Sequence, residues 1–207
     1  MKPKILGIST SPRAKGNTDL LLREVLAGAE SAGGEVEYIA LRDHNISPCV
    51  ECNACYKTGR CKTQDDYQGI SEKMIKADRL ILATPIFFMA VCAQCKLLID
   101  RCQCLWSHKY ILKKPLVSSN NRERYGAVIA VGGSRSTKMF GCIRLTMKYF
   151  FDVLDMAFAG GIFVNKVEAA GDILNHPTAM SQAYDYGRQL VLDAGPRPEG
   201  PVNIELT

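Results

Sequence analysis

Four cysteines stand close together in one polar loop and could hold a metal. Cys49, Cys52, Cys55 and Cys61 form the pattern Cys-x2-Cys-x2-Cys-x5-Cys, in a segment introduced by a proline and containing a glycine. Thiolates at a spacing of three in a tight, irregular loop can reach three corners of an iron-sulfur cube, and the longer gap lets the fourth reach the remaining iron. The spacing therefore favours an iron-sulfur cluster.

A zinc site and free thiols are the alternatives for this loop. Structural zinc usually takes two cysteine pairs separated by roughly 12 to 20 residues, so a compact set of four cysteines fits zinc less well. Free cysteines are commonly buried. This loop also carries Glu51, Asn53, Lys57 and Arg60, and a polar loop is a poor place to bury thiols.

Residues 9–18 predict an anion site. They read Ser-Thr-Ser-Pro-Arg-Ala-Lys-Gly-Asn-Thr, between an apolar run and a helical pattern. Hydroxyls and free amides at a helix N-terminus bind anions, and Arg13 adds a planar cation that suits phosphate oxygens. Pro12 and Asn17 stand where a nucleoside-triphosphate loop needs glycine and lysine, which disfavours that ligand. A solvated capping loop is the alternative.

Two further loops could border a ligand. Thr84, Pro85, Ile86, Phe87, Phe88 and Met89 follow one apolar run, and Gly132, Gly133 and Ser134 follow the next. Two adjacent phenylalanines in an exposed loop are costly unless they cover something flat, and core packing is their alternative. The glycines would let the backbone approach a ligand closely because no side chain intervenes.

Alternating strands and helices would position these loops. Apolar runs predict strands at 4–9, 36–41, 80–83, 125–131 and 161–164, and helical spacing predicts helices from 19 to a stop at Gly33-Gly34 and at 65–77, 138–156 and 177–192. Asn17 or Thr18 is expected to cap the first helix. Buried strands alternating with helices indicate a parallel sheet, which binds ligands at the carboxyl ends of its strands. Pro196, Pro198 and Pro201 predict an extended tail.

Length and composition indicate a single α/β domain over residues 1–207. The chain has 207 residues, of which 47% are hydrophobic and 23% charged, as in soluble globular proteins. The longest apolar stretch, 80–93, is shorter than the roughly 18 to 20 residues of a membrane helix, so no membrane partner is expected. The N-terminus lacks the apolar segment of a secretory signal, which predicts a cytoplasmic protein with reduced thiols.

Taken together, these motifs resemble the archaeal iron-sulfur flavoproteins of the flavodoxin-like NAD(P)H-dependent FMN reductase superfamily. The resemblance rests on residues 9–18, the four-cysteine motif, and residues 84–101 with Ala93, Gln94, Lys96, Asp100 and Arg101, and it runs from about Lys4 to at least Ile173. It implies a flavodoxin-like, doubly wound, five-stranded parallel sheet in the order 2-1-3-4-5. It also implies that 47–64 is an inserted iron-sulfur loop after the second strand.

The resemblance further implies the cofactor sites. The FMN phosphate would be held by Ser9, Thr10, Ser11, Arg13, Asn17 and Thr18, and the isoalloxazine bordered by Thr84 to Met89 and by Gly132, Gly133 and Ser134. Cys49, Cys52, Cys55 and Cys61 would ligate a 4Fe-4S cluster. Two departures stand out: Met89 replaces a common glycine and is expected to crowd one flavin face, and Cys92 and Cys95 occupy the next helix. That pair could hold a second metal, but burial in the core is favoured for it and for Cys142.

These cofactors together predict an electron-transfer oxidoreductase. FMN accepts one or two electrons and a 4Fe-4S cluster passes one, so the pair would connect FMN to a one-electron carrier such as ferredoxin. No catalytic side chain is expected. In the resembling family the cluster reaches the flavin of a neighbouring subunit, which implies a homodimer or homotetramer. The alternative is an NAD(P)H-dependent FMN or quinone reductase with a structural zinc loop.

The charge of the chain agrees with bound anions better than with nucleic acid. The net charge of +5 comes from 26 basic and 21 acidic residues, and a cubane and a phosphate ester would each contribute roughly −2. A redox sensor that binds nucleic acid has no helix-turn-helix or aromatic-basic surface to support it. Lys109, Lys113, Lys114, Arg122 and Arg124 could dock an acidic ferredoxin, with a solvated loop as the alternative.

Overall fold

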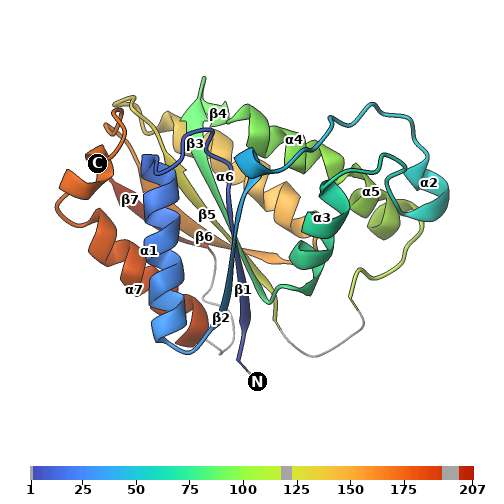
Figure 1. The fold of residues 1–207 in the computed structure, drawn as a ribbon, viewed down its shortest axis with the longest axis horizontal. Helices are drawn as coiled ribbons and strands as arrows, with labels where there is room; N and C mark the ends of the chain where they lie inside the picture. The colour runs from blue at the N-terminus through green and yellow to red at the C-terminus, as the bar shows by residue number, and fades with distance from the viewer. Residues whose placement is uncertain (1, 118–122, 193–200) are drawn as a thin grey trace.

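The apolar runs of the sequence form one twisted sheet at the centre of the molecule (Figure 1). The computed structural model describes residues 2–117, 123–192 and 201–207. Within them the strands are β1 (Lys4–Ser9), β2 (Glu35–Ala40), β3 (Arg79–Phe87), β4 (Ala90–Val91), β5 (Tyr125–Val131), β6 (Ala157–Val164) and β7 (Val202–Leu206). They lie in the order β2-β1-β3-β5-β6-β7, all parallel, and β4 pairs antiparallel to β3.

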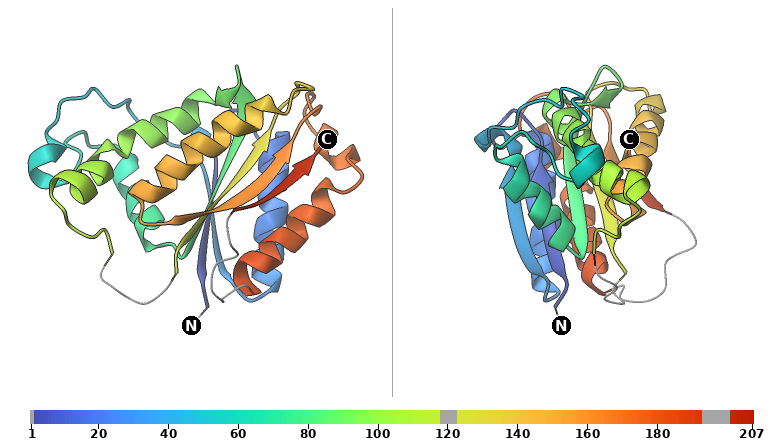
Figure 2. Two further views of the ribbon diagram at one scale, coloured as in Figure 1. Left: turned by 180° about the vertical axis from the view of Figure 1, so that it is seen from behind. Right: turned by 90° about the vertical axis from the view of Figure 1, so that its right-hand side faces the viewer.

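Helices cover both faces of the sheet (Figures 1 and 2). They are α1 (Asn17–Ser31), α2 (Cys55–Thr58), α3 (Tyr67–Lys76), α4 (Ala93–Arg101), α5 (Gln103–Trp106), α6 (Lys138–Val153) and α7 (Ala179–Leu192), with short turns at Leu41–Asp43, Ser107–Ile111 and Asp172–Asn175. Helices α1 and α7 cover one face, and α3, α4 and α6 cover the other. No helix in the described ranges has the length and apolar character needed to cross a bilayer.

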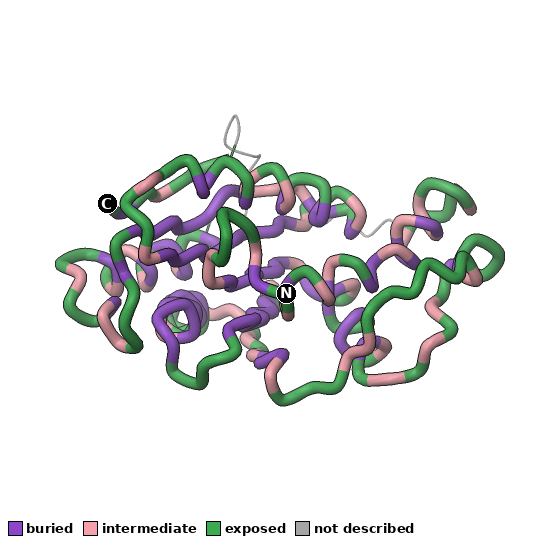
Figure 3. The backbone as a smooth tube through the Cα atoms, turned by 90° about the horizontal axis from the view of Figure 1, so that it is seen from above, coloured by how far each residue is buried: buried purple, intermediate pink, exposed green. Residues whose placement is uncertain are grey.

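Side chains alternate between two apolar cores because successive residues of a strand point to opposite faces. Ile5 packs toward α1 and α7, whereas its neighbour Leu6 packs toward α3, α4 and α6. The central strands β1, β3 and β5 are buried over most of their length, whereas the edge strands β2 and β7 are partly exposed. The segment before α2 is largely exposed, and Figure 3 shows the distribution of buried and exposed residues along the chain. The predicted parallel α/β architecture is confirmed.

The order of the whole sheet differs from the predicted five-stranded one. The five expected strands are β1, β2, β3, β5 and β6, and they keep the expected relative order, but β4 and β7 enlarge the sheet to seven strands in the described residues. Strand β7 pairs with β6 where an extended tail was expected. Gly160 permits this pairing, because a Cβ at its φ of +97° would lie 2.0 Å from the carbonyl oxygen of Val202. Pro196 and Pro198 lie outside the described residues.

The expected cap of α1 is wrong, although the expected stop is confirmed. Gly16 occupies the capping position, and no side chain caps the helix there. The Asn17 side chain points instead to the loop after β6, donating to the Ala169 carbonyl at 2.8 Å and accepting from the Gly171 amide at 2.9 Å. At the other end, Gly33 has a φ of +94°, which is the left-handed stop that was predicted.

Strand β3 runs on past its predicted end and turns back through a tight hairpin. Phe87 pairs with Ala90, so Phe88 and Met89 are the two turn residues, with φ angles of +49° and +64°. Positive φ at both positions is typical of a turn that favours Asn-Gly. Core packing is therefore the wrong interpretation of Phe88, which is fully exposed at the tip. The conformation also accounts for why glycine suits position 89.

We expect Met89→Gly to stabilise the protein by about 1 kcal/mol, because glycine adopts positive φ without the steric cost that methionine bears. Urea unfolding measures this difference. Ala90→Gly, one residue further on in β4, is the control and should lower the free energy of unfolding because it only adds backbone freedom. A loss of stability in Met89→Gly would mean that contacts of the methionine side chain outweigh the strain.

Candidate functional site

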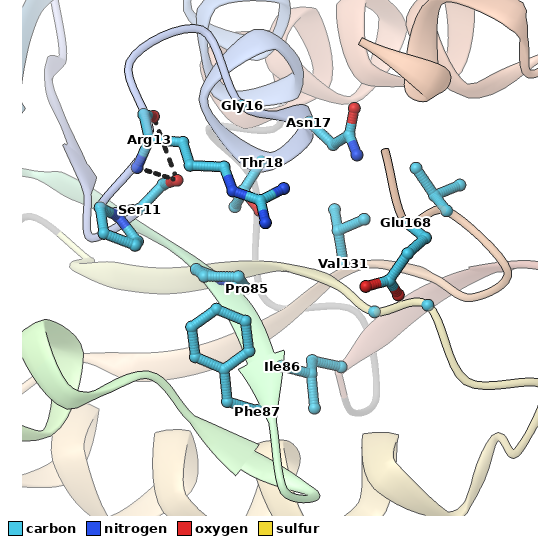
Figure 4. Close-up of a pocket in the computed structure, with 14 residues that line it drawn as sticks. Ser11, Arg13, Gly16, Asn17, Thr18, Pro85, Ile86, Phe87, Val131 and Glu168 are labelled. Atoms are coloured by element: carbon cyan, nitrogen blue, oxygen red, sulfur yellow. Dashed lines mark hydrogen bonds between the residues drawn. The ribbon is translucent and has the colours of Figure 1, made fainter. Parts of the chain in front are cut away.

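A cleft opens where β1, β3 and β5 end, next to the N-terminus of α1 (Figure 4). Its volume, open to solvent, is about 560 Å³. Residues from all three predicted ligand loops line it: Ser11, Arg13, Asn17, Thr18, Pro85, Ile86, Phe87, Gly132 and Gly133. Pro12, Gly16, Val131, Val167 and Glu168 complete the lining. The parallel topology alone brings these distant segments together, since every strand of the path ends at the same edge.

One end of the cleft is suited to an anion. The first intrahelical bond of α1 joins the Leu20 amide to the Gly16 carbonyl at 2.9 Å, so the amides of the three residues before Leu20 remain available at the helix N-terminus. Ser11 and Arg13 close a small turn through two 3.2 Å hydrogen bonds at the Ser11 hydroxyl. The Arg13 guanidinium extends across the mouth of the cleft in Figure 4. Helix amides and an exposed guanidinium are a typical phosphate-binding combination.

The other end of the cleft is flat and partly apolar. Pro85, Ile86 and Phe87, which Figure 4 shows, line this part of the cleft together with Gly132 and Gly133. A Cβ at Gly133 would lie 1.5 Å from a carboxylate oxygen of Glu168. The Glu168 carboxylate can therefore lie in this position because Gly133 has no side chain. A ligand that reaches this end would meet apolar side chains and glycine backbone.

Glu168 is a lining residue that sequence reasoning missed. It lies in the loop after β6, and the two bonds of Asn17 to Ala169 and Gly171 hold that loop against the cleft. Its carboxylate lies against Gly133, where it is the nearest group that an added Cβ would meet. No local pattern signals this position, because the contact joins residues about 150 positions apart.

Six predicted ligand residues do not line the cleft. Ser9, Thr10 and Thr84 are buried beneath it, Phe88 and Met89 form the hairpin tip, and Ser134 accepts a hydrogen bond from the Ser136 amide at 3.1 Å. The Thr10 hydroxyl donates to the Ala83 carbonyl at 2.9 Å, and the Thr84 hydroxyl to the Pro85 carbonyl at 2.9 Å. These hydroxyls fasten β1 to β3 and shape the hairpin. Met89 was expected to crowd one flavin face, but Met89 does not line the cleft.

A buried carboxylate lies just behind the anion end. Asp19, in the first turn of α1, accepts hydrogen bonds from Tyr38 and Arg23 and pairs with Arg42. Burial raises the pKa of Asp19, but the hydrogen bonds from Tyr38 and Arg23 help to lower it below its usual range. The negative charge is thus neutralised within the fold and does not oppose an anion in the cleft.

The four cysteines line no part of this cleft: Cys49 and Cys52 precede the short helix α2, Cys55 begins it and Cys61 follows it. Cys49 and Cys52 are exposed, Cys55 is buried and Cys61 is half-buried. Burial raises the pKa of Cys55, a hydrogen bond from Ser107 lowers it by less, and the neighbouring Cys49 and Cys52 thiols raise it further.

The donor set of this loop suits an iron-sulfur cluster in its chemistry. It offers four thiols, and soft thiolates select such clusters or zinc. Across the described residues, however, no three His, Cys, Asp or Glu side chains are gathered closely enough to hold a metal ion. The thiols that would bind a cluster are present on one loop, and the metal site itself stays a prediction.

Arg101, the last residue of α4, joins both ends of the cysteine loop. One guanidinium nitrogen donates to the Ser47 carbonyl at 2.7 Å and to Asp65 at 2.6 Å. The other terminal nitrogen donates to the Thr63 carbonyl at 3.2 Å and to the second Asp65 oxygen at 3.2 Å. Arg101 is only 1% exposed, so this bidentate pair is shielded from water. We call it the Arg101 clasp.

We expect Asp65→Asn to remove stability that depends on pH. Burial raises the pKa of Asp65, but hydrogen bonds from Arg101 and from two backbone amides lower it by more, to about 2. A carboxyl whose pKa falls on folding adds stability above about pH 4, and this stability is lost as the pH falls through about 2. In urea unfolding, the wild type should exceed Asp65→Asn by about 2 kcal/mol near neutral pH.

That difference should close as the solution is acidified, because protonated aspartic acid and asparagine are both neutral. Asp66→Asn is the matched control, since Asp66 is exposed and lies outside the clasp. A wild-type advantage that persists below about pH 2 would contradict the assigned role of Asp65.

The remaining cysteines divide between core and surface. Cys92, Cys95, Cys102 and Cys104 are buried, as favoured for the first pair. Cys92 donates its thiol proton to the Thr10 carbonyl at 3.1 Å and so belongs to the packing under the cleft. Cys142 is exposed, and its predicted burial is wrong because Met139, Phe140 and Ile143 supply the face of α6 that packs on the sheet.

Part of the basic stretch proposed for ferredoxin is already engaged within the fold. Lys109 pairs with Asp155 at 2.9 Å and also contacts Asp152. Arg124 is half-buried and donates to the carbonyls of Met74, Ile75, Ala77 and Leu154. Lys113 and Lys114 are exposed, and Arg122 lies outside the described residues.

Comparisons with known proteins agree with this geometry. Residues 3–171 match the family model described as NADPH-dependent FMN reductase. An iron-sulfur flavoprotein of Methanocaldococcus jannaschii is 35% identical over 196 residues, which cover 90% of this chain and 95% of that protein. A Bacillus subtilis protein named as an NAD(P)H-dependent FMN-containing oxidoreductase is 30% identical over 184 residues, covering 87% of this chain and 94% of the other.

A comparison with a solved structure supports the assignment of the fold. A flavodoxin from the domain Archaea superposes with a TM-score of 0.54 at 11% identity, covering 92% of this chain and 98% of the flavodoxin, which supports the flavodoxin-like architecture. The family match covers most of the chain and includes both the cleft and the cysteine loop. The chain is therefore an FMN-dependent oxidoreductase of the NADPH-dependent FMN reductase family, and it belongs among the iron-sulfur flavoproteins of that family.

Proposed function

We propose that this protein transfers electrons between FMN in the cleft and a 4Fe-4S cluster on the cysteine loop. The observation that carries the proposal is the presence, on one chain, of an anion-binding cleft and a separate loop with four thiols closed by the Arg101 clasp. FMN supplies chemistry with one or two electrons, and a cluster exchanges one, so such a protein connects the two kinds of carrier.

The cleft residues fit FMN at both ends. Ser11, Arg13 and the first amides of α1 would hold the phosphate, with Asn17 and Thr18 at the helix start. Pro85 to Phe87 and the Gly132-Gly133 backbone would border the ring system. Glu168 is the one carboxylate among the described lining residues, and we assign the protein the tasks of binding and orienting the cofactor.

The four cysteines would hold the cluster, and this half of the proposal has a defined alternative. Cys49, Cys52, Cys55 and Cys61 carry only thiols, which suits iron-sulfur ligation. The same thiols could instead bind zinc as a structural element. The protein would then be a simple NAD(P)H-dependent FMN or quinone reductase, as the name of the Bacillus subtilis relative suggests for that protein.

One measurement separates these two functions: FMN, iron, zinc and acid-labile sulfide per chain in anaerobically purified protein. The electron-transfer proposal expects one FMN with about four irons and four sulfides. Flavin with zinc and no sulfide would contradict the electron-transfer proposal and leave the reductase.

Nine cysteines and an oxygen-sensitive cluster would call for a reducing compartment, for which we propose the cytoplasm.

We also propose partners for this electron-transfer function. Ferredoxin is the one-electron carrier that we propose, with exposed Lys113 and Lys114 as its contacts. A homodimer or homotetramer is proposed because the exposed tip residues Phe87, Phe88 and Met89 would be covered by a second copy. Light scattering of the cofactor-loaded protein tests the assembly, and reduction by ferredoxin at rising salt tests the electrostatic contact.

A further inference from the structure

Glu168 places a negative charge inside a cleft whose other end is suited to an anion. It is the one carboxylate among the described lining residues, and one of its oxygens lies 1.5 Å from the position that a Cβ of Gly133 would take. Within the described ranges, no hydrogen bond or ion pair engages this carboxylate. Exposed glutamates are common, but this one lies at the carboxyl edge of a parallel sheet, where ligands bind.

The backbone that carries Glu168 is fixed on both sides of the residue. Just before it, the Val167 amide donates to the Gly132 carbonyl at 3.3 Å. Just after it, the Ala169 carbonyl accepts a hydrogen bond from the Asn17 side chain at 2.8 Å. These contacts join the loop after β6 to the loop after β5 and to α1. The fold therefore presents the carboxylate to the cleft from a preorganised backbone.

The cleft holds a cation and an anion that do not pair with each other. Arg13 and Glu168 both line it, and Figure 4 shows Arg13 on the loop before α1 and Glu168 on the loop after β6. In the part of the chain that the structure describes, the two side chains form no ion pair. Both charges thus remain available to a ligand, and a few placed polar groups of this kind fix the orientation of a ligand in its pocket.

FMN has groups of matching character at separate places. Its phosphate is anionic, whereas the hydroxyls of its ribityl chain and the imide N–H of its ring system are hydrogen-bond donors. An ionised carboxylate only accepts hydrogen bonds, so Glu168 can satisfy one of these donors but repels the phosphate. With the phosphate at Arg13 and the first amides of α1, the donors of the cofactor are left for Glu168.

We propose that Glu168 is a cofactor-contacting residue that accepts a hydrogen bond from FMN and lowers the reduction potential of the bound flavin. The inference deepens the proposed function and rests on one part of it, the placement of FMN in the cleft; no cysteine takes part. Reduction adds electrons to the ring system, and a fixed negative charge nearby disfavours the more negative form. A hydrogen bond to a charged acceptor strengthens the binding of the cofactor.

The first test is a redox titration of the bound flavin, followed by absorbance, in anaerobically purified wild type and Glu168→Gln. The variant keeps an acceptor oxygen and removes the charge. At a fixed potential, its ratio of reduced to oxidised FMN should rise at least tenfold, which is about 30 mV for two electrons. A metal centre on the cysteine loop would be common to both proteins, so the comparison isolates the flavin.

The second test measures the dissociation constant of oxidised FMN by flavin fluorescence. Glu168→Ala removes the acceptor and should weaken binding about tenfold, whereas Glu168→Gln should weaken it less because its carbonyl oxygen still accepts. Glu30→Gln is the matched control, since Glu30 is exposed in the last turn of α1, at the end of the helix away from the cleft. The same loss of charge there should leave both the potential and the affinity unchanged.

The inference requires both the higher potential and the weaker binding. An unchanged potential in Glu168→Gln overturns it, and so does equal or tighter FMN binding by Glu168→Ala, which would mean that the carboxylate only repels the cofactor. Equal shifts of potential in Glu30→Gln and Glu168→Gln would show an effect of net charge alone and overturn it as well. If Glu168→Ala retains no FMN, the potential of Glu168→Gln decides.

The failure of this inference and the failure of the proposed function give different results. Wild-type protein that contains FMN, together with variants that match it in potential and affinity, overturns the role of Glu168 and leaves the proposed function standing. Wild-type protein that binds no FMN removes the proposed function, and the inference with it.

Discussion

Cys61→Ala should lose nearly all iron and acid-labile sulfide and keep FMN. Cys61 lies on the cysteine loop and does not line the cleft, so its removal takes one of four ligands from the cluster and none from the flavin. A 4Fe-4S cluster with three protein ligands has an open iron and is expected to be lost during purification. Iron, sulfide and flavin analysis of the same sample gives the result, from about four irons per chain to below one.

Cys142→Ala is the matched control for this experiment. Cys142 is exposed on α6, so its replacement should change neither cofactor. Loss of FMN together with iron in Cys61→Ala would contradict the separation of the two sites, because it would show that the cysteine loop is needed for the fold of the whole chain. Full iron retention would exclude Cys61 as a ligand.

Arg13→Ala should weaken FMN binding by roughly 10- to 100-fold, because hydrogen bonds to a charged group are worth about 1.5 to 3 kcal/mol. Arg13 is exposed at the mouth of the cleft, opposite the first amides of α1, where the phosphate is proposed to lie. The backbone amides remain in the variant, so binding is reduced and not abolished. Recovery of flavin fluorescence on dilution measures the dissociation constant.

Lys15→Ala provides the control for the effect of charge alone. Lys15 carries the same charge on the same loop but does not line the cleft, so its replacement should change FMN affinity much less. Iron content should equal that of the wild type in both variants. Equal losses of affinity in the two would contradict a direct contact between Arg13 and the phosphate and would favour a general electrostatic attraction.

Local sequence patterns were sufficient for most of the sheet. Continuous apolar runs predicted the core strands within a few residues of their observed bounds, for example Lys4–Ser9 and Tyr125–Val131. Such runs are informative because a strand buried on both faces must be apolar throughout. Glycine at Gly33 likewise predicted the end of α1, since few other residues adopt its conformation.

Positions that depend on contacts between distant segments could not be predicted in this way. Asn17 was expected to cap α1. Its side-chain amide instead forms hydrogen bonds to the loop after β6, which is distant in the sequence. Strand β7 was missed although Val202, Ile204 and Leu206 alternate with polar residues, because the neighbouring prolines favoured an extended tail, and its pairing with β6 depends on the distant Gly160. Cys142 was misplaced because the orientation of α6 is set by its larger neighbours.

The sequence by itself determined the family, the parallel α/β class and the two sets of residues that bear chemistry, because their types and spacing are local properties. Only the tertiary structure decided which of those residues meet. It gathered Ser11, Arg13, Phe87 and Gly133 into one cleft and added Glu168. It also closed the cysteine loop with Arg101, since a buried guanidinium and its acceptors are brought together by packing across 54 positions of the chain.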